Sequence, residues 1–198
     1  MPDLTLFHTA QVHCDTFNAL APDADLVHLV REDWLARAQG GINETLSPEI
    51  AAAVKAAEGP VLCSCTTLGE AAEAAGAIRI DWPMMQEAAR MGGPVLMVYC
   101  LDSTAAPSKA LLRRAFSKEN KEAVIRTFPL TGLWRHFSDG DVETFNEQIA
   151  IWIDSCLAMA PDTACVVLAQ ASMAGAAPLV QGDVPVPVPY PPLTPPTK

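Results

Sequence analysis

The chain has 198 residues, of which 50% are apolar, and this is enough to build one large domain or two small lobes. Its net charge of -10, from 23 acidic and 13 basic side chains, argues against nucleic acid and against an anionic membrane surface as partners. No run approaches the roughly 18 apolar residues of a membrane-spanning helix. Residues 1–20 lack the pattern of a signal peptide, and six cysteines are too few for a disulfide scaffold, so we expect a cytoplasmic protein.

Apolar runs alternate with helical patterns along most of the chain. In chain order the sequence predicts strands at 4–7 and 26–30, a helix at 47–57, a strand at 61–64, a helix at 66–75, a strand at 77–80, a helix at 83–91, a strand at 95–99, a helix at 108–121, a strand at 124–128, a helix at 141–159 and a strand at 165–168. Ser47 and Pro48 are typical of a helix start. The alternation predicts an α/β fold with parallel sheets covered by helices on both faces.

The predicted elements divide into two halves. We expect two similar doubly wound parallel-sheet lobes with a cleft between them, the first formed by residues 1–92 and the second by 93–177. The tail, 178–198, is rich in proline, which excludes a helix or a central strand and favours extended backbone. We expect it to return to the first lobe as a strap or to form a loose end, and a Pro-rich ligand for a partner is the remaining alternative.

An internal repeat indicates where the site lies. Residues 61–72 align without gaps with 166–177, and both segments run from an apolar strand through a small polar turn into an Ala-rich helix. The alignment pairs Cys65 with Gln170 and Thr67 with Ser172. Ligands of open α/β sheets bind beyond the carboxyl ends of the strands, so we expect Cys65 and Gln170 to line opposite sides of the cleft.

Cys65 has the most specific chemistry in these turns. It ends a predicted strand and precedes a predicted helix, where the N–H groups and the dipole of the helix favour its thiolate. The backbone N–H groups and hydroxyls of Thr66 and Thr67 are suited to hold a carboxylate. A thiolate beside a bound carboxylate can remove a proton from the carbon alpha to that carboxylate. The alternative is a buried, inert Cys65.

Several motifs together resemble the aspartate/glutamate/hydantoin racemase superfamily over residues 4–178. They are Cys65-Thr66-Thr67-Leu68-Gly69, Arg79-Ile80-Asp81 with Pro83-Met84, Ser103-Thr104 with Pro107-Ser108, and the run 168–173. The resemblance implies two α/β lobes with the site between them, no cofactor, and two cysteines on opposite faces of the substrate carbon. On these motifs Thr104, Gln170 and Ser172 join Thr66 and Thr67 as expected substrate-binding residues.

Gln170 departs from that pattern, because it stands where racemases have their second cysteine. A neutral amide forms hydrogen bonds but is neither a base nor a ready source of protons. The sequence therefore predicts a site with a single thiol. His8 and Thr9 end the first predicted strand and are expected to face the cleft. Thr9 would bind substrate, and His8 would supply the second acid or base, since histidine titrates near neutrality.

The sequence predicts no cofactor and no metal site. Cys63 and Cys65 form a C-x-C pair, but no second pair of cysteine or histidine residues lies at zinc-ligand spacing. Residues 103–136 carry seven basic and two acidic side chains. This segment is either a solvated helix face or, in the sharper interpretation, the self-association surface of a homodimer.

We expect a cofactor-independent isomerase, similar to amino-acid racemases, that acts on the carbon alpha to a carboxylate of a small acidic substrate with Cys65 as thiolate base. One alternative is a lyase or hydrolase that acts on a related small acid with a single catalytic cysteine. The other is a non-catalytic protein that binds small acids. No nucleic acid or membrane partner is expected.

Overall fold

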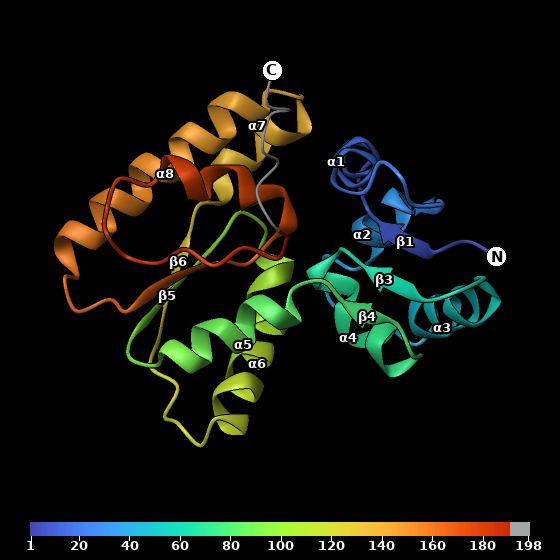
Figure 1. Cartoon of the computed structure of the whole chain (residues 1–198), viewed down its shortest axis with the longest axis horizontal. Coiled ribbons are helices and arrows are strands. Elements are labelled where there is room, and N and C mark those ends of the chain that lie inside the picture. The colour runs from blue at the N-terminus through green and yellow to red at the C-terminus, as the bar shows by residue number, and fades with distance from the viewer. Residues whose placement is uncertain (191–198) are drawn as a thin grey trace. The chain divides into compact units, whose positions relative to one another are not determined.

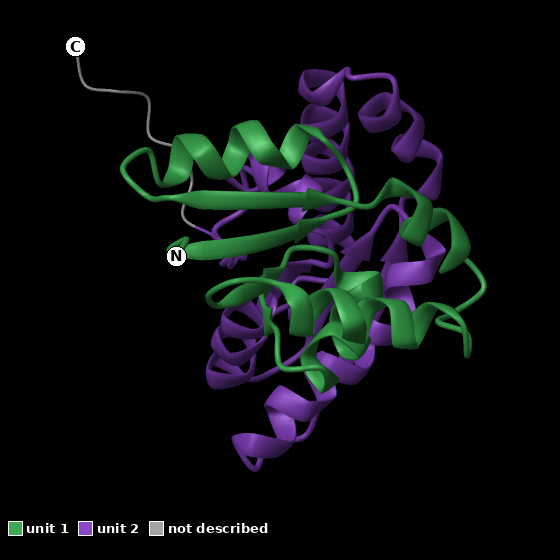
Figure 2. Cartoon of the chain, turned by 90° about the vertical axis from the view of Figure 1, so that its right-hand side faces the viewer, with its two compact units in different colours: residues 1–80, 193–198 green, residues 81–192 purple. Residues whose placement is uncertain are grey.

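The structure is a computed structural model that describes residues 1–190 (Figure 1). It divides into two compact units, the first Met1–Ile80 and the second beginning at Asp81 (Figure 2). Each unit contains its own parallel sheet, which confirms the α/β class with two parallel sheets.

The first unit is built on a four-stranded parallel sheet in the order β2-β1-β3-β4. The strands are β1 (Leu4–His8), β2 (Leu26–Val30), β3 (Val61–Cys63) and β4 (Ile78–Arg79). The helices are α1 (Val12–Leu20), α2 (Glu32–Arg37), α3 (Leu46–Ala56) and α4 (Thr66–Ala74).

The two faces of this sheet differ in composition. Successive side chains of a strand point to opposite faces, so neighbours along β1 serve different layers. Phe7 packs in an apolar cluster with buried side chains of α2, α3 and α4, among them Trp34 and Ile50. His8 and His28 point to the opposite face, which α1 covers. Figure 2 shows helices of the first unit, in green, on both sides of its strands. The α1 face therefore carries the two histidines of this sheet.

The second unit is built on a three-stranded parallel sheet in the order β6-β5-β7. The strands are β5 (Val95–Tyr99), β6 (Ile125–Pro129) and β7 (Cys165–Leu168). The helices are α5 (Trp82–Met91), α6 (Asp102–Lys118), α7 (Trp134–Ser138) and α8 (Val142–Met159), with short 3-10 segments η1 (Thr131–Leu133) and η2 (Ala171–Leu179). Figure 1 shows α5 and α6 on one side of the sheet and α8 on the other. Among the described residues, no helix is both long and apolar enough to cross a bilayer.

The boundary between the units falls before α5, whereas the sequence placed it after this helix, at residue 92. The reason is packing. α5 buries Met84, Met85, Ala88 and Ala89 in the cluster formed by β5, α6 and β7. The burial of this apolar stripe joins α5 to the second unit.

All the predicted strands are confirmed to within one residue at each end, and the differences concern helices. The sequence pattern did not predict α1, α2 or α7. It predicted a start of α6 after Pro107, but the helix starts at Asp102 and passes through this proline, which removes only one backbone donor. The Ala-rich helix expected after Gln170 is the 3-10 segment η2. Gly175 within η2 lies so close to the side chain of Asn146 that a Cβ would clash.

Residues 180–190 pack on the second unit, so this part of the tail does not return to the first. The N–H groups of Gln181 and Gly182 donate to the carboxylate of Asp154 on α8, at 3.0 and 3.2 Å. Val166 of β7 donates its N–H to the carbonyl of Pro185 at 2.9 Å. The rest of the predicted strap, 191–198, lies outside the described residues.

Candidate functional site

The strongest candidate site lies at the carboxyl end of the sheet in the first unit. β1 ends at His8, and its neighbour β3 ends just before Ser64 and Cys65. The N–H of Ser64 donates to the carbonyl of Phe7 at 2.9 Å, which extends the pairing of the two strands into the turn. His8, Thr9 and Cys65 are therefore brought to the same edge of this sheet, as the sequence predicts.

Cys65 is the N-terminal cap residue of α4. Its backbone is extended (φ -97°, ψ 114°), and Thr66 and Thr67 form the first turn of the helix, where both are buried. This confirms the prediction that Cys65 lies in the turn between a strand and a helix. A thiol at such a position lies near the positive end of the helix dipole.

The cysteines differ in their exposure. Among the six cysteines, all of which lie in the described residues, only Cys65 is partly exposed. Burial raises the pKa of Cys100 to about 12 and that of Cys165 to about 11. Burial also raises the pKa of Cys14 and of Cys156. The buried thiols with raised pKa values resist ionisation, so Cys65 is the best candidate for a reactive thiolate.

A chain of hydrogen bonds runs from Ser64 through two histidines to α1. His8 Nδ1 lies 2.7 Å from Ser64 Oγ, and His8 Nε2 lies 2.9 Å from His28 Nδ1. His28 Nε2 lies 3.0 Å from Asn18 Oδ1. Burial, and then repulsion from His13 and His28, lowers the pKa of His8 to about 3. His8 is therefore uncharged at neutral pH, which argues against the role of proton donor expected for it.

The remaining predicted site residues lie in the second unit. Gln170 Oε1 accepts hydrogen bonds from the backbone N–H groups of Cys100, at 2.6 Å, and Leu101, at 3.0 Å. Thr104 donates its hydroxyl to the carbonyl of Leu101 at 2.7 Å. The hydroxyl oxygen of Ser172 is buried and has no hydrogen-bond partner among the described residues. Gln170 thus ties the end of β7 to the start of α6. Its position opposite Cys65 across a cleft stays a prediction.

The structure also brings together three residues that the sequence does not predict to meet. His8, Cys14 and His28 offer metal-ligating atoms that all lie within 4.8 Å of one another. They come from β1, α1 and β2, and their spacing along the chain matches no short zinc motif. The β1-α1-β2 crossover assembles them, so no local sequence signal could have found them. These residues can hold a metal ion, which the expectation of no metal site did not foresee.

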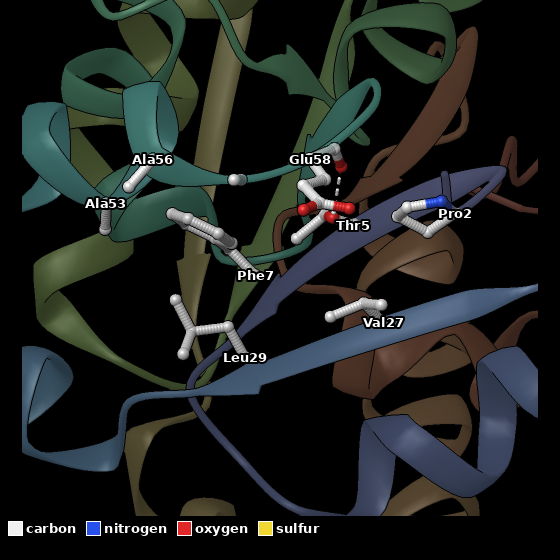
Figure 3. Close-up of a pocket in the computed structure, with 9 residues that line it drawn as sticks. Pro2, Thr5, Phe7, Val27, Leu29, Ala53, Ala56 and Glu58 are labelled. Atoms are coloured by element: carbon white, nitrogen blue, oxygen red, sulfur yellow. Dashed lines mark hydrogen bonds between the residues drawn. The ribbon is translucent and has the colours of Figure 1, made fainter.

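A pocket of about 370 Å³ opens on the other face of the same sheet (Figure 3). It is lined mainly by apolar side chains of β1, β2 and α3, such as Phe7, Leu29 and Ala53. The hydroxyl of Thr5 in its wall donates to the backbone carbonyl of Glu58 at 2.7 Å. None of the predicted site residues lines this pocket, so it does not serve the predicted chemistry.

The basic side chains of 103–136 are partly engaged within the second unit. Arg114 and Lys118 lie over the ring of Trp82, at 4.5 and 4.8 Å from its centroid. Arg126 forms an ion pair with Asp162 at 2.7 Å. The self-association surface of a homodimer stays a prediction.

No protein-family model and no curated protein matches the chain. Its function is therefore inferred from the residues and contacts described above.

Proposed function

We propose that the chain is a cofactor-independent isomerase, similar to amino-acid racemases, that acts on the carbon alpha to the carboxylate of a small acid with Cys65 as thiolate base. The observation that supports this most is the position of Cys65. It is a partly exposed thiol at the N-terminal cap of α4, beyond the carboxyl end of β3. The helix N-terminus favours the thiolate, because backbone N–H groups and the helix dipole stabilise negative charge there.

The first turn of α4 suits the carboxylate of the substrate. Backbone N–H groups in the first turn of a helix have no acceptor within the helix, and anions bind to them. Thr66 and Thr67 supply these groups next to Cys65. In the proposed reaction Cys65 Sγ takes the alpha proton, and the electron pair of the C–H bond passes into the carboxylate to form an enolate. Return of a proton to carbon restores the acid, with retained or inverted configuration.

Gln170 does not act as the second base in this proposal. Its amide is not basic, and its oxygen already accepts two backbone N–H groups. With one thiol, exchange of the alpha proton with retention needs only Cys65, whereas inversion needs another donor. The same observation favours, as the second candidate function, a lyase or hydrolase with a single catalytic cysteine.

His8 is a positioning residue in this proposal. It is buried, and its Nδ1 lies 2.7 Å from the hydroxyl of Ser64, the residue before Cys65. The hydroxyl of Ser64 also donates to the carbonyl of Phe7 at 3.1 Å. These contacts fix the turn that carries the thiol.

Proton exchange tests the proposal. The protein is incubated in D2O with aspartate, glutamate and the corresponding 2-hydroxy acids, and the alpha proton is followed by NMR and the configuration by chiral chromatography. We expect deuterium at the alpha carbon of at least one acid, with retention faster than inversion. Cys65→Ser should slow exchange about a hundredfold or more, since a hydroxyl is a far weaker base.

The matched control is Cys63→Ser, because Cys63 is a buried thiol two positions earlier on β3. It should keep the native exchange rate. Exchange that is equally fast in Cys65→Ser would contradict the proposal. A protein that exchanges no acid, but whose Cys65 is protected from alkylation by one of them, would be a binding protein instead.

A further inference from the structure

The face of the first sheet beneath α1 holds a cluster of nitrogen and sulfur ligands. His8 and His28 lie on neighbouring strands and point to this face, and α1 adds Cys14. The ligating atoms of the three residues lie within 4.8 Å of one another. His8 and Cys14 are buried, whereas His28 is half-buried on an edge strand. The cluster therefore sits in a low-dielectric site with one side near solvent.

The outer hydrogen bonds of the two histidines decide where their lone pairs lie. The hydroxyl of Ser64 donates to the carbonyl of Phe7 at 3.1 Å, so Ser64 Oγ accepts from His8 Nδ1 at 2.7 Å. At the other end, His28 Nε2 donates to Asn18 Oδ1 at 3.0 Å. A neutral imidazole carries one N–H. The inner nitrogens, His8 Nε2 and His28 Nδ1, then both present lone pairs across 2.9 Å.

Two lone pairs that face each other repel unless a proton or a metal ion lies between them. The third group, Cys14, is a thiol that loses its proton when it ligates a metal. The arrangement of donors and acceptors thus suits a bound metal ion.

We propose that His8, Cys14 and His28 bind Zn²⁺ through His8 Nε2, His28 Nδ1 and Cys14 Sγ, with a fourth position left for water or a small ligand. Zinc–nitrogen bonds of about 2.0–2.1 Å and a zinc–sulfur bond of about 2.3 Å place the ligand atoms of a tetrahedral site roughly 3.3–3.7 Å apart. The two nitrogens, 2.9 Å apart, must separate by about 0.4 Å. The sulfur, which lies within 4.8 Å of both, must approach by at most about 1.2 Å. A set of two imidazoles and one thiolate favours zinc over magnesium or calcium.

The residues around the three ligands complete the site. Histidine ligands of zinc usually donate their other N–H to a fixed acceptor, and Ser64 and Asn18 supply those acceptors here. Asn18 is exposed, so the ion can enter beside His28. Cys65 is not a ligand, and the zinc site does not rest on the proposed isomerase activity.

Metal titration of the full-length protein tests this site. After removal of metals with a chelator, Zn²⁺ alone is titrated against a competing chromophoric chelator, and Co²⁺ serves as the spectroscopic probe. We expect one equivalent to bind and to raise the melting temperature, since binding stabilises the folded state. Bound Co²⁺ should show the intense visible bands of tetrahedral coordination and a thiolate charge-transfer band in the near ultraviolet.

Variants assign the ligands. Cys14→Ser should abolish the charge-transfer band, and Cys14→Ser and His28→Gln should each weaken binding about a hundredfold or more. Ser64→Ala removes only an outer contact and should weaken binding about tenfold. Cys65→Ser and His136→Gln, which change a thiol and a histidine outside the cluster, should bind zinc like the native protein. Circular dichroism of the metal-free variants verifies that each is folded.

Three results would overturn the proposal. The first is no saturable zinc binding by the native protein. The second is binding that survives Cys14→Ser and His28→Gln unchanged, and the third is binding that is lost in Cys65→Ser. The last result would place the metal on the thiol of the proposed isomerase instead.

Discussion

The turn after β3 and the turn after β7 leave their sheets in the same way. Each strand lies beside the first strand of its unit, and each turn begins with the same backbone hydrogen bond. Ser64 donates its N–H to the carbonyl of Phe7, and Ala169 donates its N–H to the carbonyl of Val98, both at 2.9 Å. The strand order of the first three strands in each unit is also the same. The internal repeat is therefore expressed in the backbone up to this point.

The next residue of each turn has a different task. Cys65 follows Ser64 and keeps a partly exposed thiol, while the side chain of Ser64 ties the turn to β1. Gln170 follows Ala169 and itself ties its turn to the start of α6 through two hydrogen bonds. The two turns thus share their backbone geometry but differ in the role of this side chain. In the first turn the Cys65 thiol is accessible for chemistry, and in the second the Gln170 amide holds the structure together.

The largest expected effect is the difference in thiol reactivity between the units. With its pKa raised to about 12, Cys100 holds roughly a thousandfold less thiolate at neutral pH than an ordinary thiol does. Cys65 should therefore react with iodoacetamide at least about a hundredfold faster than Cys100, as measured by mass spectrometry of peptides over time. Cys65→Ala should remove the fast phase. Equal alkylation rates for all six cysteines would contradict the proposed difference in thiol reactivity between the two turns.

The next effect concerns stability. Gln170→Ala leaves the buried N–H of Cys100 and that of Leu101 without their acceptor, which should lower the free energy of unfolding by about 2–4 kcal/mol. The matched change in the other turn, Cys65→Ala, should cost less than about 1 kcal/mol. Denaturant unfolding followed by tryptophan fluorescence measures both. Similar losses in the two variants would show that Cys65 is also structural.

A smaller, pH-dependent effect comes from Tyr190, whose hydroxyl donates to the carbonyl of Ala171 in the second turn at 3.0 Å. Burial raises the pKa of Tyr190 to about 12, above the usual value near 10. Its contribution to stability is complete below pH 10 and is lost as the pH rises towards 12, by up to about 1.4 kcal/mol per pH unit. In a Tyr99→Phe background Tyr190 is the one tyrosine, and its absorbance should titrate near pH 12. A midpoint near 10 would mean that the tail is not held on this turn.

A smaller effect than that of Gln170→Ala is expected for Ser64→Ala, which removes the side-chain hydrogen bonds that hold the first turn. It deletes the hydrogen bonds to the carbonyl of Phe7 and to His8, and should cost about 1 kcal/mol. Thermal unfolding measures this loss. A cost as large as that of Gln170→Ala would indicate that the two turns are held equally firmly.

Sequence patterns predicted the strands well, because short apolar runs between helical patterns are distinctive. They also placed Cys65 correctly at a strand-to-helix turn, since the turn lies between an apolar run and an Ala-rich helix. They missed α1, whose buried side chains include His13 and Cys14 and so form no plain apolar stripe. The cluster of His8, Cys14 and His28 depends on three elements meeting in space. The hydrogen bonds to the Gln170 oxygen likewise could not be predicted, because their donors lie about seventy positions earlier in the chain, after β5.

The contact between Pro185 and Val166 has a consequence for solubility. β7 is an edge strand, and its run Cys165-Val166-Val167-Leu168 is apolar and β-branched, as in segments that assemble into intermolecular sheets. The carbonyl of Pro185 accepts the outward N–H of Val166, and Pro185, Pro187 and Pro189 have no N–H to donate to an incoming strand. The Pro-rich segment thus prevents strands of other molecules from pairing with β7. A chain cut before Pro185 would offer β7 as a template to other molecules and should aggregate at concentrations at which the intact chain stays dispersed.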